Sequence, residues 1–527
     1  MNTSKIKIPF KLRFMSALRV MLDSFTIVFF KLRYWRRGKK MPPITDDILR
    51  QPAVEVARKI RNKEITSVEV VDACIRRIKA INPIVNCLVA DRFELALQEA
   101  RKADEILQSG SKTVDQLMQE TPFLGVPFTA KDSISVKGLP QTAGIFIRKC
   151  CLAEEDAKVI ALLRENGAII IGVTNVPELC MWWESYNKLY GRTSNPYNTT
   201  RIVGGSSGGE GCIQAAAGSC FGIGSDIGGS IRMPAYFNGV FGHKPSKKVV
   251  SNHGQYPIAE TNMVDELLCI GPLTKFAVDL KHILKVIGGE NSKKLKLDEP
   301  VDIGKIKVFY QYSNNAPITS KVDPEIKSAI DKIIKYFATK YKIVSEQKNI
   351  EELKVSAGIW FSDLASSASS EVPMGDYLMK NYSYSANIRE IMKSLVGLSK
   401  NTLVVLLAAL AVTKPDKTKS EDAKYYKVFG DNLKEIFKEM LGDNGIFIFP
   451  VHPTPAPYHN QTILRPMNFM YTAIINSLGL PATSVPMGLS SDGVPIGIQV
   501  IANLDNDRLC LAVAEDLEKE FGGWIES

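Results

Sequence analysis

Histidine is scarce in this sequence, and the residues that usually bind metal ions are not grouped. Only five histidines occur among 527 residues, and there is neither an HExxH pattern nor a Cys/His cluster. The nine cysteines form no CxxC pair and no regular spacing, which excludes a disulfide framework and favours buried free thiols. We therefore expect no metal and no cofactor.

Net charge is missing from the body of the chain. The protein carries +10, but residues 1–43 contain eleven Lys or Arg residues and a single acid, Asp23. The remaining residues contain 55 basic and 55 acidic side chains. A neutral body gives no electrostatic support to a nucleic-acid surface, so we expect no nucleic-acid partner.

The apolar stretch near the N-terminus, residues 14–30, is at the short limit for crossing a bilayer. Six Lys or Arg residues follow it within residues 31–40, and no signal-peptide cleavage pattern is present. Its polar members fall on one stripe of a helix, and two of them have the spacing of an ion pair: Ser16, Arg19, Asp23 and Thr26. We predict that residues 1–43 form a membrane anchor with a basic tract.

Two arrangements of this anchor remain open. It is either a spanning helix whose polar stripe packs against a partner, or an amphipathic helix in the interface whose basic residues are held by anionic lipid. Basic residues occur on both sides of the apolar stretch, so the side of the membrane stays undetermined. We expect a membrane-associated protein, single-pass or monotopic.

The rest of the chain alternates between strand-length apolar runs and helical segments, with no linker or internal repeat past residue 45. This alternation predicts an α/β fold with a sheet covered on both faces, and we expect one catalytic domain over 44–527.

A capping box at Thr66 to Glu69 marks one helix start. We expect strands near 123–129, 168–173, 307–310, 445–449 and 496–501, and helices near 68–82, 92–107, 156–166, 278–286 and 324–337.

Residues 402–412 are the most apolar run of the body, but ten unbroken apolar residues are too few to span a bilayer. A buried core helix fits them. An exposed cap helix that dips into a membrane or lines an acyl tunnel also fits, and the apolar residues 395–398 favour that second interpretation. The candidate cap is therefore residues 395–412.

Glycine and serine are concentrated in residues 204–230, which hold ten of the 37 glycines and five serines. No lysine follows these glycines as a P-loop requires, and a Rossmann GxGxxG pattern is incomplete. Glycine lets backbone N–H groups converge on a ligand, so Ile227, Gly228, Gly229 and Ser230 form a candidate nest for an oxyanion. A lone turn of this kind would be only structural, but two turns with serines favour a site.

Two serine chemistries fit this stretch. A nucleophile elbow, G-x-S-x-G, is centred on Ser207, and a Ser-His-Asp hydrolase would then use His452 or His459 downstream. Alternatively a buried lysine replaces histidine as the base, and Lys131, at the end of a strand-like run, is the candidate. A lysine at a strand end is otherwise an ordinary surface charge.

The motifs GGSSGGEG and GSDIGGSIRMP, together with TAKD upstream, resemble the amidase signature family of serine hydrolases. TNVPEL, YGRTSNPYN, FGHKPS and GLPATSVPMG extend the resemblance over about residues 45–525. Within the family, ELCMWWES, RPMNFMYT and LEKEFGGW are most similar to the fatty-acid amide hydrolases, in particular their second, membrane-anchored type.

The resemblance implies a single α/β/α domain with a mixed sheet of about eleven strands and a Ser–cis-Ser–Lys triad. In that triad Ser230 is the nucleophile, Ser206 the middle serine and Lys131 the base. The amides of residues 227–230 would hold the oxyanion, and Ser207, Asp226 and Arg232 would support the loops. The implied reaction is hydrolysis of N-acylethanolamines and primary fatty amides, lipid-like substrates drawn from a bilayer.

Several other functions also fit the sequence. They are an amidase or esterase for another substrate class with the same triad, an amidotransferase subunit that acts on glutamine, a Ser-His-Asp hydrolase, and a lipid-binding relative without catalysis. An amidotransferase subunit should lack a membrane anchor, and the intact Lys131, Ser206 and Ser230 set argues against a non-catalytic binder. Oligomeric state is not determined by the sequence, and a homodimer is one arrangement that we keep open.

Overall fold

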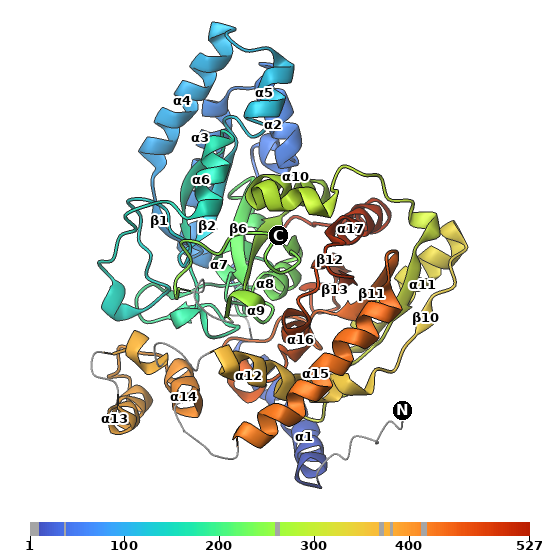
Figure 1. Ribbon diagram of the computed structural model, residues 1–527. Helices are drawn as coiled ribbons and strands as arrows, with labels where there is room; N and C mark the ends of the chain where they lie inside the picture. Colours follow the sequence, from blue (N-terminus) through green and yellow to red (C-terminus); the bar gives the residue numbers. More distant parts are fainter. Residues whose placement is uncertain (1–9, 36–37, 259–263, 368–373, 380–382, 413–418) are drawn as a thin grey trace.

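A large mixed sheet forms the centre of the protein. The computed structural model describes residues 10–35, 38–258, 264–367, 374–379, 383–412 and 419–527. The strands are β1 (Leu88–Asp91), β2 (Pro127–Lys131), β3 (Ile169–Thr174), β4 (Tyr186–Asn187), β5 (Gly191–Arg192), β6 (Phe221–Asp226), β7 (Phe241–Lys244), β8 (Cys269–Thr274), β9 (Lys307–Tyr310), β10 (Glu346–Gln347), β11 (Gly445–Pro450), β12 (Ala482–Leu489) and β13 (Pro495–Ala502). Eleven of them form one sheet in the order β1-β3-β2-β6-β8-β7-β12-β13-β11-β9-β10, which confirms the predicted α/β fold (Figure 1).

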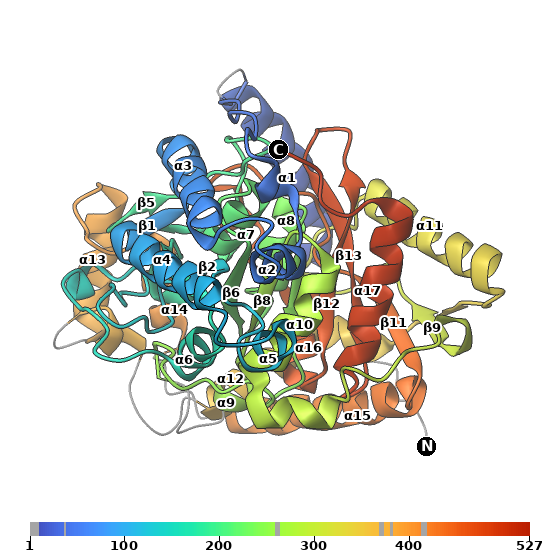
Figure 2. The same ribbon diagram turned by 90° about the horizontal axis from the view of Figure 1, so that it is seen from above.

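Helices cover both faces of this sheet (Figures 1 and 2). They are α1 (Phe10–Arg33), α2 (Ala53–Arg61), α3 (Ser67–Val85), α4 (Phe93–Ser109), α5 (Val114–Glu120), α6 (Lys158–Glu165), α7 (Gly208–Ala215), α8 (Arg232–Asn238), α9 (Val264–Leu267), α10 (Ala277–Gly288), α11 (Pro324–Tyr341), α12 (Ser356–Ser367), α13 (Tyr384–Leu395), α14 (Leu403–Val412), α15 (Lys419–Leu441), α16 (Met470–Leu478) and α17 (Asp507–Phe521). The capping box at Thr66 is present at the start of α3, and that helix continues past the predicted end to Val85.

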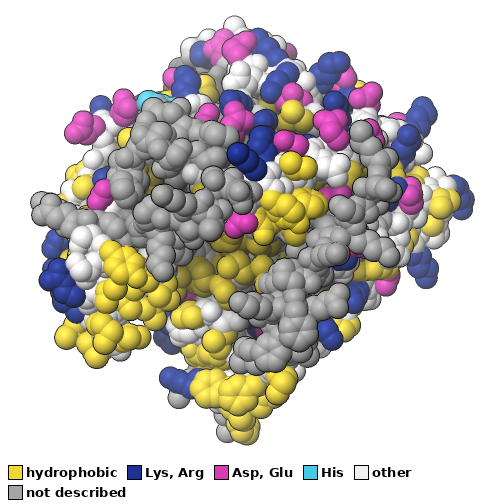
Figure 3. Space-filling view, turned by 60° about the horizontal axis from the view of Figure 1, so that its bottom comes forward, with side chains coloured by type: hydrophobic (Ala, Val, Ile, Leu, Met, Phe, Trp, Pro, Cys, Tyr) yellow, Lys and Arg dark blue, Asp and Glu magenta, His cyan; other side chains and the backbone are white. Residues whose placement is uncertain are grey.

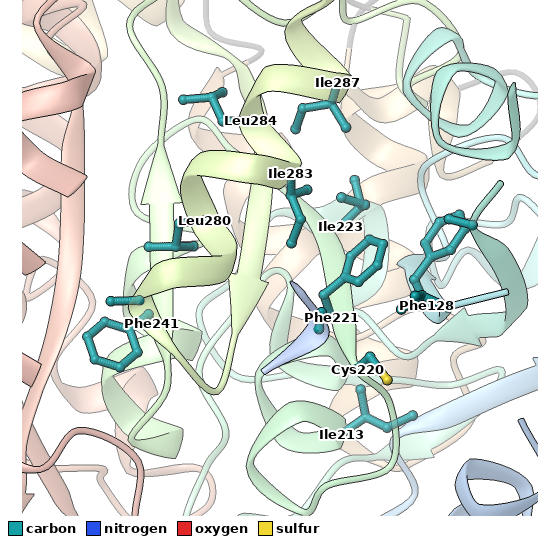
Figure 4. Close-up of a cluster of buried hydrophobic side chains, with 14 of the residues drawn as sticks. Phe128, Ile213, Cys220, Phe221, Ile223, Phe241, Leu280, Ile283, Leu284 and Ile287 are labelled. Atoms are coloured by element: carbon teal, nitrogen blue, oxygen red, sulfur yellow. The ribbon is translucent and has the colours of Figure 1, made fainter. Parts of the chain in front are cut away.

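The two faces of the sheet bury different side chains because successive residues of a strand point in opposite directions. In β11, Ile446 and Ile448 join the larger core under α3, α10, α11 and α17, whereas Phe447 and Phe449 join the core under α8, α15 and α16. Figure 4 shows the first face, where Leu280, Ile283 and other apolar residues of α10 lie over the strands that carry Phe221 and Phe241. The sheet is therefore rigidly packed on both sides at the place where the glycine-rich turns leave it.

Helix α1 lies against the body with its polar side inward. Arg19 Nη1 donates a hydrogen bond to the Ile318 carbonyl, and Arg465 Nε lies 2.9 Å from Asp23 Oδ1. Thr26 is buried, while the side chain of Ser16 lies outside the described ones. The polar stripe predicted from the sequence thus has a partner, and that partner is the protein's own body. Among the described residues, no helix combines the length and the apolar character needed to cross a membrane.

The apolar segment at 402–412 is mostly covered. Val405, Leu406 and Ala409 of α14 are buried in a small separate cluster with residues from the 143–179 region. Most of the exposed apolar side chains lie on α13 and in the turn after it, Ile388, Met392, Leu395, Val396 and Leu398, and α14 adds Leu407. Of the predicted cap, residues 395–398 therefore have most of the exposed apolar surface, and the buried side of α14 packs on the body. Figure 3 shows two groups of apolar side chains on the face that carries α13 and α1.

Candidate active site

Lys131 is buried at the carboxyl end of β2, between two parallel neighbours, β3 and β6. Carboxyl ends of parallel strands meet at one edge of a sheet, and the two glycine-rich turns converge on the same edge. The Nζ atom of Lys131 donates to Ser206 Oγ at 2.6 Å and to Ser225 Oγ at 2.9 Å. This lysine is therefore not a surface charge but the centre of a buried polar group.

Ser206 lies in the first glycine-rich turn, directly before α7. The peptide bond between Gly205 and Ser206 is cis. A Cβ atom on Gly205 would lie 2.5 Å from the Trp182 carbonyl oxygen, so only glycine fits at that position. The close packing of this turn brings the Ser206 hydroxyl to the lysine amine.

Ser230 lies in the second turn, which follows β6. The Ser207 N–H donates to the Ser230 carbonyl at 3.0 Å and so joins the two turns. The hydroxyl of Ser207 accepts from the Ser225 N–H at 3.2 Å and donates to the Ser225 carbonyl at 3.3 Å. Ser207 thus lies between the two turns and the end of β6.

Three amides of the second turn are available to a ligand. Gly229 N–H donates to Asp226 Oδ1 at 2.6 Å. Within the described parts of the chain, the amides of Ile227, Gly228 and Ser230 have no internal acceptor. Gly229 has φ +117°, and a Cβ there would lie 2.0 Å from Thr472 Oγ1, so glycine is required for this turn.

Asp226 and Arg232 form a fully buried ion pair beneath the turn, with Arg232 Nη2 3.0 Å from Asp226 Oδ1. The carboxylate also accepts from the Ile231 N–H and from Asn476 Nδ2, and the guanidinium also donates to Gln499 and to the Thr472 carbonyl. Burial alone would raise the pKa of Asp226, but Arg232 and these donors hold it well below its usual range. The pair fixes the loop that carries Ser230.

Burial lowers the pKa of Lys131, because the interior disfavours the ammonium form, although Cys180, Asp226 and Glu210 oppose the shift. Burial also raises the pKa of Glu210 to about 8, against the effect of its hydroxyl donors Thr129 and Thr174. Both shifts reduce the charge under the two turns. A neutral amine at Lys131 is able to accept a proton from Ser206.

Three residues of this site were not singled out as functional in the sequence: Ser225, Cys180 and Glu210. Ser225 is a second hydroxyl partner of the Lys131 amine. The half-buried Cys180 lies beside Lys131 and Ser206, and burial raises the pKa of its thiol. Ser225 and Glu210 fall inside the glycine-rich motifs, and Cys180 falls inside ELCMWWES, which indicated only the family resemblance.

The two candidate histidines have other partners. His452 is buried against Trp183 and Phe237, and its Nδ1 lies 2.8 Å from the Thr454 carbonyl oxygen, to which it donates. His459 Nδ1 pairs with Glu184 Oε1 at 3.1 Å. Among the described residues neither hydrogen-bonds to Ser207, so the Ser-His-Asp alternative finds no support in this geometry. No group of three or more His, Cys, Asp or Glu side chains suited to a metal ion occurs in the same part of the chain.

Comparison with known proteins agrees with this fold. The sequence model of the Amidase family matches residues 69–511. Human fatty-acid amide hydrolase 2 is 41% identical over 494 residues, covering 93% of this chain and 92% of that protein, and fatty-acid amide hydrolase 2-A of Danio rerio is 42% identical over 491 residues, covering 92% of each. A solved structure titled fatty acid amide hydrolase has a TM-score of 0.68 at 20% identity, with 98% of this chain and 92% of that chain covered, and so shows the shared fold.

These findings define the class as an amide-hydrolysing enzyme. The chain belongs to the amidase family, the amidase signature group that its motifs resemble.

Proposed function

We propose that the protein hydrolyses fatty-acid amides, including N-acylethanolamines and primary fatty amides, with Ser230 as nucleophile, Ser206 as proton relay and Lys131 as base. The observation that carries this proposal is the buried Lys131 amine, 2.6 Å from Ser206 Oγ and shielded from water below the turn of Ser230. A buried amine that is neutral supplies the base that a serine nucleophile needs.

The chemistry proceeds through an acyl-enzyme. Neutral Lys131 takes a proton from Ser206, and Ser206 takes one from Ser230 as the Ser230 Oγ attacks the amide carbonyl carbon. The negative charge that develops on the carbonyl oxygen is held by the amides of residues 227–230, of which the Gly229 amide is shared with Asp226. The relay returns the proton to the leaving amine, and water then cleaves the acyl ester to release the fatty acid.

Apolar side chains next to the second turn favour a fatty acyl group. A Cβ built on Gly228 would lie 3.4 Å from Phe469 and from Trp360, and Trp360 Nε1 donates to the Ile227 carbonyl at 2.9 Å. Behind them α12, α16 and the turn before α16 add further apolar residues: Ala357, Leu364, Met467, Met470 and Ala473. An acyl chain bound at Ser230 would therefore meet a largely apolar surface.

Membrane association fits such a substrate. Residues 1–43 are the anchor and 44–527 the catalytic domain, with α1 lying in the interface as an amphipathic helix rather than as a separate span. The exposed apolar side chains of α1 and of residues 388–398 would face lipid, on the face shown in Figure 3. Of the basic tract, Arg36 and Arg37 lie outside the described residues.

The test is labelling of the full chain with a fluorophosphonate, followed by identification of the modified peptide. We expect the label on Ser230 and its loss, together with all amide turnover, in Ser230→Ala, because removal of a nucleophile typically costs several decades of rate. Ser219→Ala is the matched control, since Ser219 is a buried serine of the same stretch that donates to the Phe221 carbonyl. Turnover in Ser230→Ala, or a label on Ser207, would exclude the proposed nucleophile.

Substrate class is tested separately with amides of increasing acyl length. We expect kcat/KM to rise with chain length up to long acyl groups. A preference for short or polar acyl groups would leave the triad intact but exclude fatty amides as the substrate.

A further inference from the structure

The outer side of α1 is a continuous apolar stripe. Met21, Phe25, Val28 and Leu32 of α1 and Trp35 in the turn after it follow one another at spacings of three and four residues, and each is between 60% and 72% exposed. The opposite side carries Arg19 and Asp23, which pair with the body. Helix α1 is therefore amphipathic in the reverse sense of an ordinary surface helix, because its charges face the protein and its apolar residues face outward.

The apolar stripe ends at a basic cavity. An open cavity of about 560 Å³ lies between the C-terminal end of α1 and the body. Leu32 and Trp35, the last two members of the stripe, line it together with three lysines, Lys31, Lys39 and Lys40. Its other walls come from the N-terminal segment, Tyr34 and Gly38, and from the body, Tyr197, Asn198, Thr200 and Tyr458. Among the residues that the structure describes, no acidic one lines this cavity.

The three lysines have no carboxylate partner among the described residues, although many other exposed lysines of the protein have one, such as Lys248 with Glu266. The walls, in contrast, are held in place. Tyr34 stacks on Tyr458 with ring centres 5.6 Å apart, and the Lys39 N–H donates to Thr199 Oγ1 at 2.7 Å. Three positive charges, unpaired with any carboxylate in the described parts of the chain, thus converge on a defined concave surface.

We propose that this cavity binds the phosphate-bearing headgroup of an anionic phospholipid whose acyl chains lie along the apolar stripe of α1. The headgroup supplies the negative charge that no described carboxylate gives these lysines. Trp35 and the tyrosines lie where aromatic side chains are favoured, between headgroups and acyl chains. This inference rests on the membrane association proposed above and assigns a specific lipid site to it.

The test compares two triple variants by flotation with vesicles. One variant is Lys31→Gln with Lys39→Gln and Lys40→Gln. The control is Lys63→Gln with Lys102→Gln and Lys327→Gln, which removes the same charge from exposed positions outside the cavity. Vesicles contain phosphatidylcholine alone or phosphatidylcholine with phosphatidylserine, and turnover of a soluble ester confirms that each variant is folded.

For the cavity variant we expect affinity for phosphatidylserine vesicles to fall on the order of tenfold to a hundredfold, with binding to phosphatidylcholine unchanged. The control variant should behave like the wild type. An equal loss in both triple variants would mean that only net charge matters and would overturn the lipid site. A wild type that floats with neither vesicle would overturn the proposed membrane association itself, so the two failures are distinguishable.

A second measurement separates lipid from free phosphate. The fluorescence of the full chain is titrated with dispersed short-chain phosphatidylserine and with inorganic phosphate, and the Trp35→Phe variant provides the baseline. We expect a Trp35-dependent change at far lower concentrations of the lipid. An equal response to inorganic phosphate would show an anion site without lipid specificity and would overturn the proposal.

Discussion

The Glu178 carboxylate accepts a hydrogen bond from the Thr402 backbone N–H at 2.6 Å. Both residues are buried. Glu178 belongs to the segment after β3 that places Cys180 beside Lys131, whereas Thr402 directly precedes α14. An acidic side chain at a helix start satisfies an otherwise unpaired amide and favours the helix dipole. One carboxylate thus ties the support of the exposed apolar segment 388–398 to the catalytic region.

Replacing Glu178 by alanine should loosen that support. Without its acceptor the buried Thr402 N–H is unpaired, at a cost of about 1–3 kcal/mol. We expect faster amide hydrogen exchange in residues 399–412 and a several-fold lower kcat/KM for long-chain amides, with little change for a short soluble ester. Glu178→Gln is the control, since its side-chain carbonyl still accepts the bond. Unchanged exchange in Glu178→Ala would show that α14 is held by its apolar contacts alone.

Amidase activity should rise with pH as Lys131 loses its proton. Because burial lowers the pKa of Lys131, the neutral amine forms at a pH below the ordinary lysine value of about 10.5, and the active fraction increases through that pKa. Lys131→Ala should lose most amidase activity and the alkaline rise, with a smaller loss on esters, whose leaving groups need less protonation. The measurement is kcat/KM against pH for an amide and its matched ester.

Lys275 offers a matched control for that experiment. It is also fully buried with a pKa lowered by burial, but its Nζ donates to the Ser219 carbonyl. Lys275→Met should leave the shape of the pH profile unchanged, even where stability falls. An optimum near pH 6 in the wild type, or an alkaline rise that persists in Lys131→Ala, would contradict the lysine mechanism.

The buried pair of Asp226 and Arg232 should dominate the stability of the second turn. Asp226→Asn leaves the Arg232 charge buried without its counter-ion, and we expect a loss of about 3–5 kcal/mol in the free energy of unfolding. Since the folded-state pKa of Asp226 is depressed, its contribution is present above about pH 4 and is lost as the pH falls. Urea unfolding at several pH values measures both effects. Asp302→Asn, at an exposed pair with Lys305, should change stability by about 0.5 kcal/mol or less.

The sequence predicts strands on either side of the centre of the sheet, β2, β3, β9, β11 and β13, but not the four central strands β6, β7, β8 and β12 or the short edge strands β1 and β10. β6, which leads to the second turn, contains Gly222 and Gly224, and glycine normally argues against a strand. The structure gives the reason, because a Cβ on Gly222 would lie 1.8 Å from Glu210 Oε2 and one on Gly224 would lie 2.7 Å from Ser207 Oγ. Such close approaches between segments are set by tertiary packing, which a single sequence does not reveal.

The packing of helix α1 likewise depends on a contact that the sequence alone does not reveal. The spacing of Arg19 and Asp23 predicted their contact, and their side chains lie 3.7 Å apart. The closer partner of Asp23, however, is Arg465, far along the chain. The sequence therefore predicted a polar stripe and left its packing against a partner as one of two arrangements, because the partner is determined by long-range contacts.

Removal of residues 1–43 should weaken membrane binding and spare catalysis on soluble substrates. A chain that begins at Ile44 loses ten net positive charges, each basic residue near an anionic surface contributing about 1 kcal/mol, and also the apolar stripe of α1. The exposed apolar residues of α13 remain, so we expect weak binding that carbonate or salt reverses. Arg465 returns to solvent instead of staying buried and unpaired, and the contacts of Lys131 with Ser206 are untouched.

Flotation of both forms with vesicles, with activity measured in each fraction, tests this prediction. Equal, carbonate-resistant flotation of both forms would place the anchor elsewhere, and a truncated chain that is inactive on a soluble ester would make α1 part of the catalytic fold.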